Sequence, residues 1–474
     1  MNKLKLVLAF SILTVLLHAE IRLPHIFSDN MVFQQQTKVS VWGWAKPHAV
    51  VRISPSWDNV HYEVKADRDG RWRTKIATPI AGETPYQLII SDGNPLILKN
   101  ILIGEVWLCS GQSNMEMPMK GFKNTPVLHG NIDILESKNP QIRLITVKRN
   151  DQLQPVDDIT GSWKEATPEV VSKFSATAYY FGRMLNKLLG IPVGLICSSW
   201  GGSPIEAWMS ADDLKTFPNE KIPQPGDTIK SPNRTPTLLF NGMIQPIIGF
   251  TIKGCIWYQG ESNYDNPDEY AALFEKMVSS WRNLWGEGNF PFYFCQIAPF
   301  DYASITPKDE QTIKTNSAYL REAQYNAAKV IPNSGMAVLM DIGEKECIHP
   351  QRKSVGGERL AMLALGKTYG MQGFGYESPV YYSMTVVKDK AILSFDNAPM
   401  WLTSFGKELR CFEIAGANKV FYPAMAEIKR SKIVVSSPNV PEPVAVRYAF
   451  KDFIVGDLYS TEGLPISSFR TDNW

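Results

Sequence analysis

The hydrophobic positions of the chain change their period twice. Up to about residue 104, short runs such as 38–44 and 71–77 alternate apolar and polar residues, and turn-forming residues such as those at 67–70 separate the runs. A period of two predicts half-buried strands, and strands that recur at about every 8–12 residues are typical of a sandwich. The first stretch therefore predicts an N-terminal β-sandwich domain over residues 20–104.

Residues 105–374 combine compact apolar runs with segments of helical period. The apolar runs are 101–109, 192–200, 252–259, 290–298 and 335–343, and the helical segments are 175–189, 268–285, 316–331 and 354–369. This alternation predicts a parallel sheet with helices on both faces. Ligands bind at the carboxyl ends of the strands in such sheets, and the Pro-rich loop 209–236 is expected near that edge.

The rest of the chain, 375–474, returns to short alternating runs. They lie at 380–388, 390–396, 410–416, 419–424, 432–437 and 445–450. These runs predict a C-terminal β domain, with packing against the first β unit as one arrangement. The predicted fold class is α/β, with sandwich-like β units at both ends.

Residues 1–19 have the pattern of a secretory signal peptide. Lys3 and Lys5 precede an apolar run of 12 residues at 6–17, and Ala19 offers a small residue for cleavage. The run is shorter than the roughly 20 residues that a membrane-spanning helix needs, and no Cys follows it to carry a lipid. The sequence predicts an exported protein, periplasmic or extracellular, without a membrane anchor.

Composition narrows the class of function. The 49 Lys and Arg residues nearly balance 47 Asp and Glu residues, which argues against nucleic acid as the main partner, because phosphate binding needs a clustered basic surface. Charged residues at 20% and hydrophobic residues at 44% exclude a disordered chain. Four of the six cysteines stand in apolar runs and are expected as buried free thiols: Cys109, Cys197, Cys255 and Cys295.

Among the histidines, His349 alone follows a strand of the central region. It also precedes a predicted helix, which places it at the strand-end edge, where a general base would be useful. Acidic residues stand 3, 5 and 8 positions before it, namely Glu346, Glu344 and Asp341, and a carboxylate can orient a catalytic imidazole. A hydrogen-bonded loop histidine is the simpler alternative.

Ser113 stands in a turn between the apolar run 103–109 and a possible helix from Glu116. A serine on a tight strand-to-helix turn is exposed, as a nucleophile needs to be. The pattern is not G-x-S-x-G, because Met115 occupies the place of the second glycine, so an α/β-hydrolase elbow is disfavoured. A plain helix-capping serine remains the alternative.

Two further strand ends are rich in polar residues and glycine, at 197–208 and 257–263. Gly201 or Gly202 could donate a backbone N–H to an oxyanion, and Gln259 could donate from its side-chain amide. Ordinary turns with helix caps would have the same pattern.

Four motifs occur in the order that a known family has. They are Gly-Gln-Ser-Asn-Met at 111–115, Trp-Gly-Gly-Ser-Pro-Ile-Glu-Ala-Trp at 200–208, Trp-Tyr-Gln-Gly-Glu at 257–261 and Ile-His-Pro at 348–350. Together they resemble the sialate O-acetylesterase family of the SGNH hydrolases. Further segments that look like this family are 238–244, 321–324, 412–416 and 468–471, so the resemblance runs nearly end to end.

The resemblance implies a flavodoxin-like three-layer SGNH hydrolase catalytic domain over residues 105–374. Ser113 would be the nucleophile and His349 the base. Glu346 stands where the wider superfamily has the orienting Asp. Because Glu is one methylene longer, one of the other two acids, or a Ser–His pair without an acid, remains open.

The same resemblance implies an oxyanion hole. Its donors would be the Ser113 N–H, the N–H of Gly201 or Gly202, and the side chain of Gln259. In the wider superfamily the last donor is an Asn, so this sequence departs from the pattern at Gln259.

The implied activity is that of a serine esterase, which removes O-acetyl groups from sialic acids through an acetyl-serine intermediate without a metal or organic cofactor. The partner is then O-acetylated sialic acid or a related acetylated glycan. Side chains expected to bind it are Trp200, Asn241, Glu261 and Arg321. Since the histidine base must be neutral, activity is expected to fall as the pH drops through about 6.5.

Two alternatives stay open. An acetyl esterase for acetylated plant polysaccharide would use the same chemistry in a more open cleft. A non-catalytic carbohydrate-binding protein would use the aromatic surfaces of the β units and would not need the Ser–His pair.

Overall fold

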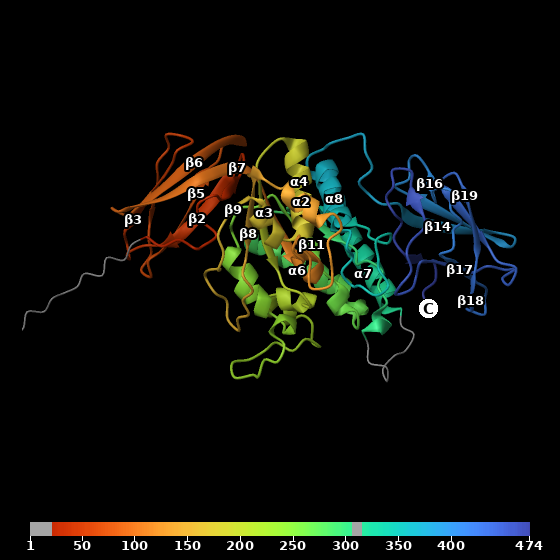
Figure 1. Cartoon of the computed structure of the whole chain (residues 1–474). Coiled ribbons are helices and arrows are strands. Elements are labelled where there is room, and N and C mark those ends of the chain that lie inside the picture. Colours follow the sequence, from red (N-terminus) through yellow and green to blue (C-terminus); the bar gives the residue numbers. More distant parts are fainter. Residues whose placement is uncertain (1–20, 306–314) are drawn as a thin grey trace, which may run out of the picture.

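The structure, a computed structural model, describes residues 21–305 and 315–474, and the predicted leader at 1–19 lies outside them. Three parts lie in a row (Figure 1): an N-terminal β unit, a central sheet with helices, and a C-terminal β unit. The chain thus has the mixed α/β architecture that the sequence predicts. Because the two β units lie at opposite ends, they do not pack against each other.

The strands of the N-terminal unit follow the runs with a period of two. They are β1 (Val32–Gln34), β2 (Lys38–Trp44), β3 (Val50–Pro55), β4 (Tyr62–Lys65), β5 (Arg71–Ala77) and β6 (Gly82–Ser91). In β5, buried Trp72 and Ile76 are flanked by exposed residues, as expected for a strand with one face in a core. Strands β2 and β5 pair with each other, while β3, β4 and β6 join the sheet of strand β7.

Strand β7 (Pro95–Gly111) is 17 residues long and belongs to two parts of the molecule. Its first half pairs with β6 and β1, in the N-terminal unit. Its second half pairs with β10 (Val193–Ser199) and β11 (Gly254–Tyr258), in the central sheet. The strand therefore runs through the predicted boundary between residues 104 and 105, and the domain division stays a prediction.

The central sheet has the strand order β13-β12-β11-β7-β10-β8-β9. Its remaining strands are β8 (Asn139–Thr146), β9 (Lys164–Ala166), β12 (Phe292–Cys295) and β13 (Ser334–Ala337). All neighbours pair in parallel except β8 and β9. The parallel sheet was predicted, but β8 and β9 were not.

Helices cover both faces of this sheet, which makes three layers. The long helices are α4 (Ala176–Leu189), α6 (Pro267–Trp285), α7 (Asn316–Val330) and α8 (Lys353–Leu363). Successive residues of β7 enter different hydrophobic cores: Leu108 packs in the core that contains α6 and α7, and Trp107 packs in the core that contains α4 and α8. Side chains of a strand point alternately to its two faces, so each face is covered by one helix pair.

The C-terminal unit contains two four-stranded antiparallel sheets that share one hydrophobic core. Their strands are β14 (Val380–Val387), β15 (Lys390–Asp396), β19 (Met425–Lys429) and β20 (Lys432–Ser436) in one sheet, and β17 (Phe412–Ala415), β18 (Phe421–Pro423), β21 (Ala445–Tyr448) and β23 (Phe469–Arg470) in the other. The predicted runs form strands here as well.

Two further predictions concern the thiols and the membrane. All six cysteines are free, and Cys109, Cys197, Cys255 and Cys295 are buried, which confirms their assignment as buried thiols. Among the helices of the described residues, none has the length and apolar character required to cross a bilayer.

Candidate active site

The ends of three neighbouring strands bring the sequence motifs together. Gly111, at the end of β7, lies opposite Tyr258 of β11 and Ser199 of β10. Gly111 has a φ of 136°, and a Cβ there would stand 2.1 Å from the Tyr258 carbonyl oxygen, so glycine is needed for this close approach. The turns that carry Ser113 and Gly201 therefore leave the same edge of the sheet.

Gln112 fixes the turn before Ser113. Its backbone N–H donates to the Tyr258 carbonyl at 2.9 Å, and its Oε1 accepts from the N–H groups of Gly260 at 3.3 Å and Ser262 at 3.1 Å. Ser113 is the first residue of the short helix α1 (Ser113–Glu116), and the capping position belongs to Gln112. The interpretation of Ser113 as a plain helix cap is therefore wrong.

Ser113 and His349 line the same cavity of about 660 Å³. No hydrogen bond joins the two side chains in the described structure. The other lining residues include Glu116, Phe122, Arg149, Gly201, Gly202, Arg234, Glu261, Ser262 and Tyr264. The structure thus places the predicted nucleophile and base in one site, 236 positions apart in the chain.

His349 is partly buried, and its ring packs edge-on to Phe122 at 5.3 Å between centroids. Burial and the positive charge of Lys353 lower the pKa of His349 to about 4. Lys353 is itself buried, with Nζ donating to Asn114 Oδ1 at 2.6 Å and to the Pro350 carbonyl at 2.8 Å. These surroundings hold the imidazole in its neutral form.

None of the three candidate acids contacts the His349 ring in the described parts of the chain. Asp341 pairs with Arg359 at 2.6 and 2.8 Å, and Glu344 accepts from the backbone N–H of Gln351 at 2.8 Å. Glu346 is exposed and makes no contact with the imidazole. The expectation that Glu346 orients the ring is therefore not met, because its side chain points to solvent.

Glu116 accepts the hydrogen bond of one of the two glycine N–H groups that were predicted as oxyanion donors. Its Oε2 accepts from the Gly201 N–H at 2.8 Å, and its Oε1 accepts from Arg149 Nε at 2.6 Å. A Cβ at Gly201 would stand 3.2 Å from Ser113 Cβ, so this glycine packs directly on the serine. In the structure as described, the N–H groups of Ser113 and Gly202 have no acceptor, which leaves them free for a ligand.

Gln259 does not reach the cavity, contrary to the prediction. Its side chain is fully buried, and Nε2 donates to the Ser203 carbonyl at 3.2 Å and to Asn263 Oδ1 at 2.7 Å. Its Oε1 accepts from the hydroxyl of Tyr270 at 2.9 Å. The amide connects the turns after β10 and β11 through these hydrogen bonds and lies in the interior, behind the residues that line the cavity.

Two predicted substrate-binding residues, Asn241 and Arg321, also lie outside the cavity. Their side chains form hydrogen bonds inside the protein. Asn241 donates from Nδ2 to the carbonyl oxygens of Gln152 and Leu153. Arg321 is fully buried on α7 and donates to Ser468 Oγ at 3.0 Å and to the Lys451 carbonyl at 2.5 Å. Arg321 therefore attaches the C-terminal segment to the central part and does not line the cavity.

Comparison with known proteins decides the family. The carbohydrate esterase family described as sialic acid-specific acetylesterase matches residues 103–353. The chain belongs to this family. Sialate O-acetylesterases of Rattus norvegicus and Homo sapiens are similar, at 30% identity (75% of this chain, 75% of theirs) and 29% identity (79% and 76%). The solved structure of a carbohydrate acetylesterase from Xanthomonas citri is 36% identical, with a TM-score of 0.86 over 96% of this chain and all of that chain.

The family makes this chain an esterase, which removes the alternative of a non-catalytic binding protein. Within the esterase, Glu261 lines the cavity and accepts from Asn114 Nδ2 at 2.6 Å. Burial raises the pKa of Glu261 above its ordinary value. Since Asn114 also binds Lys353, it connects a buried carboxyl group to a buried amine under the nucleophile.

Among the charged side chains in or below the cavity of the esterase, the sequence did not predict Glu116, Arg149, Arg234 and Lys353. Arg149 follows the end of β8 by three residues, so the strand-end rule would have found it had β8 been predicted. Arg234 donates from Nη1 to the Gly202 carbonyl at 3.0 Å. It comes from the loop 209–236, whose approach to the cavity depends on tertiary packing. Trp200 lies beside the cavity, with the Arg149 guanidinium 5.4 Å from its ring centroid.

Proposed function

We propose that this esterase removes O-acetyl groups from sialic acids through an acetyl-Ser113 intermediate. The observation that carries the proposal is the single cavity that holds Ser113, His349 and two guanidinium groups, of Arg149 and Arg234. Its relatives named sialate O-acetylesterase support the substrate class. Acetylated glycan is the corresponding partner.

The strand order supports an SGNH hydrolase fold for the central part. Strands β7, β10, β11, β12 and β13, numbered one to five along the chain, have the spatial order 2-1-3-4-5, which is the flavodoxin-like order. Strands β8 and β9 extend the sheet at one edge. Ser113 follows the first strand, at the point where the order reverses, and ligands bind at such switch points. Catalytic residues would then lie within 105–374, between β units at 20–104 and 375–474.

In the proposed reaction, His349 takes the proton of Ser113 as Oγ attacks the acetyl carbonyl carbon. The N–H groups of Ser113 and Gly202 donate to the oxyanion that forms, and each such donor is worth about 2.7–4 kcal/mol of barrier. The imidazolium then protonates the departing sugar oxygen. Water, deprotonated by His349, attacks the acetyl-serine and releases acetate, and this cycle requires no metal or organic cofactor.

A Ser–His pair without a third member fits the surroundings of His349. A carboxylate partner would stabilise the imidazolium and raise the pKa, whereas here burial and Lys353 lower the pKa to about 4. The imidazole is therefore neutral and ready to accept a proton over the physiological range. Its weak basicity leaves more of the stabilisation to the oxyanion donors.

The pH dependence of kcat/KM tests this arrangement. Only the neutral imidazole acts as base, so we expect a constant rate above about pH 5.5 and a fall as the pH decreases through about 4, where the ring becomes protonated. Initial rates on a soluble acetyl ester from pH 3.5 to 8, with circular dichroism to confirm folding, measure the profile. A midpoint near 6.5 would contradict the lowered pKa and show that the His349 ring has a further partner in the active enzyme.

Arg234 is the better candidate for the carboxylate of sialic acid. The Arg149 guanidinium already binds Glu116, whereas Arg234 uses one nitrogen for the Gly202 carbonyl. Its remaining N–H groups have no acceptor in the part of the chain that the structure describes. A guanidinium can bind a carboxylate through two parallel hydrogen bonds, so we assign the carboxylate to Arg234 and not to Arg321, which was expected to bind the substrate.

The substrate is tested by acetate release from O-acetylated sialic acid and from acetylated xylan. We expect preference for the sialic acid, and a KM for it that rises about tenfold or more in Arg234→Gln, since charged hydrogen bonds are lost. The control Arg410→Gln removes an exposed guanidinium of the C-terminal unit. Preference for xylan, with KM unchanged in Arg234→Gln, would favour the second candidate, an esterase for plant polysaccharide.

The proposal also includes export of the protein from the cytoplasm. The pattern of residues 1–19 supports a secretory leader. Export would bring the enzyme to glycans outside the cytoplasm, in the periplasm or beyond the cell.

A further inference from the structure

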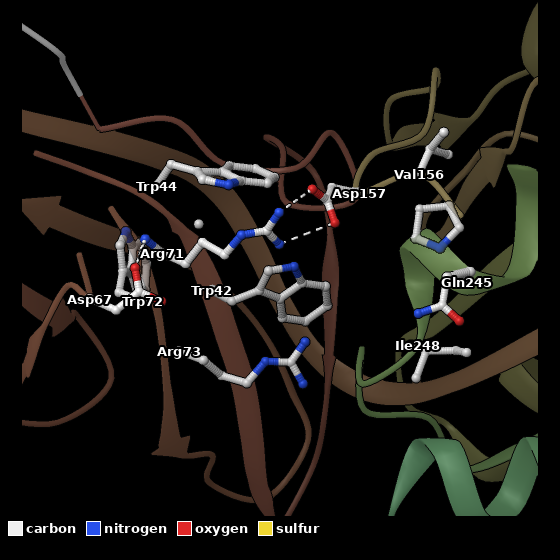
Figure 2. Close-up of a pocket in the computed structure, with 12 residues that line it drawn as sticks. Trp42, Trp44, Asp67, Arg71, Trp72, Arg73, Val156, Asp157, Gln245 and Ile248 are labelled. Carbon is white, nitrogen blue, oxygen red and sulfur yellow. Dashed lines mark hydrogen bonds and ion pairs between the residues drawn. The ribbon is translucent and has the colours of Figure 1, made fainter. Parts of the chain in front are cut away.

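A second pocket, of about 390 Å³, lies between the N-terminal β unit and the central part (Figure 2). Strands β2 and β5 form one wall, and residues 156–157 and 245–248 contribute the other. This pocket shares no lining residue with the cavity of Ser113. The proposed esterase reaction does not use it.

Aromatic and cationic side chains alternate on the β wall. Trp42 and Trp44 are two residues apart on β2, so they point to the same face. Their partners across the sheet are Arg73 and Arg71. The Arg73 guanidinium stands 4.5 Å from the Trp42 ring centroid, a distance typical of a cation–π contact. The Arg22 guanidinium lies over the Trp44 ring, 3.7 Å from its centroid, and Trp42 is buried. The wall thus combines indole rings, each with a guanidinium over one face, with planar hydrogen-bond donors.

The two arginines differ in what they bind. Arg71 donates to both carboxylate oxygens of Asp157, at 2.7 and 3.2 Å, across the gap between the walls (Figure 2). Arg73 is exposed and forms neither a hydrogen bond nor an ion pair with any described residue. The ion pair of Arg71 with Asp157 connects the two parts of the molecule. The guanidinium of Arg73 remains available for an anion.

The opposite wall supplies an amide. Figure 2 shows Gln245 facing Trp42 across the pocket, between Val156 and Ile248. Its side chain makes no hydrogen bond within residues 21–305 and 315–474. An amide offers both a donor and an acceptor, which suits hydroxyl groups.

We propose that this pocket binds an acidic sugar unit of a glycan. The pyranose ring would lie against the part of the Trp44 indole that Arg22 leaves uncovered, because such rings offer an apolar surface beside polar edges. Arg73 would bind the sugar carboxylate through two N–H groups, and Gln245 would bind hydroxyls. The shared chemistry is a carboxylated pyranose, as in a sialic acid or a hexuronic acid.

One segment of backbone connects this pocket with the catalytic cavity. Arg149 lines the cavity and Asp157 lines the second pocket. Eight residue steps span at most about 29 Å when fully extended. A glycan of several sugar units could therefore reach from the second pocket to the catalytic cavity.

The test is calorimetric titration of the unmodified enzyme and of Arg73→Gln. The ligands are sialyllactose without O-acetyl groups, trigalacturonic acid, and neutral lactose. We expect at least one acidic ligand to bind, more tightly than lactose, and to lose about tenfold or more in affinity in Arg73→Gln, as for the loss of charged hydrogen bonds. The sugar that binds identifies the acid. Trp44→Ala should weaken every ligand that binds.

Arg52→Gln is the matched control, since Arg52 is an exposed guanidinium of the same β unit that pairs with Glu63 outside the pocket. Unchanged melting temperatures confirm that each variant folds. Equal affinity in Arg73→Gln and Arg52→Gln, no binding of either acid, or a loss in Arg234→Gln in place of Arg73→Gln would overturn the proposal. The titration involves no turnover. Its result therefore does not depend on whether the proposed esterase reaction is correct.

Discussion

Replacing Ser113 by Ala is expected to lower kcat on acetyl esters by at least about 10³-fold, with binding nearly unchanged. The hydroxyl forms the covalent bond to the acetyl group. Among the described residues of the cavity, only Ser113 carries a hydroxyl on the turn after β7 and also packs against a glycine, Gly201. Steady-state rates give the loss. Mass spectrometry after rapid acid quench should find the acetyl group on the peptide that contains Ser113, in the unmodified enzyme only.

Ser262→Ala is the matched control for this variant. Ser262 lines the same cavity, and the turn holds it through its backbone N–H to Gln112, so loss of its hydroxyl should lower kcat less than about tenfold. If Ser113→Ala kept more than about a tenth of the activity, or if the acetyl group were found elsewhere, Ser113 would not be the nucleophile.

The second large effect is expected for His349→Ala. Without a base to accept the Ser113 proton, kcat should fall by at least about 10³-fold. Glu346→Gln provides the contrast, because an exposed carboxylate without contact to the imidazole should change kcat less than about threefold. Both variants are measured with the same soluble acetyl ester at pH 7.

A comparable loss in Glu346→Gln would contradict the Ser–His pair. It would mean that the loop carrying Glu346 moves to the ring when substrate binds. The pH profile would then shift as well, since a carboxylate partner raises the pKa of His349.

The sequence predicted the strands and helices where burial imposes a simple period. Strands β10 and β11 are buried along their whole length, so each is an uninterrupted apolar run that a period rule finds. Strand β8 escaped because Arg143 interrupts its apolar run; the structure buries this arginine against the carbonyl oxygens of Pro140, Asn30 and Asn100. Such backbone partners cannot be inferred from the sequence alone.

The site was predictable in position but not in detail. The rule that ligands bind at strand ends found Ser113, His349 and the 201–202 glycines, because chain order and strand order determine which turns meet. It could not tell that Gln259 turns into the protein or that Glu346 turns to solvent. Those directions depend on the side chains that surround each turn, and these come from distant parts of the chain.

The continuous strand β7 limits how this protein can be divided or recombined. A truncation at the boundary near residue 104 would cut the strand that delivers Ser113 and would remove the backbone partners of its first half. Gly104, at the midpoint, tolerates no larger residue, since a Cβ there would stand 2.1 Å from the Pro192 carbonyl oxygen. A chimera that exchanges the N-terminal unit between homologues should therefore transfer the whole of residues 95–111, or the nucleophile will lose its mechanical support.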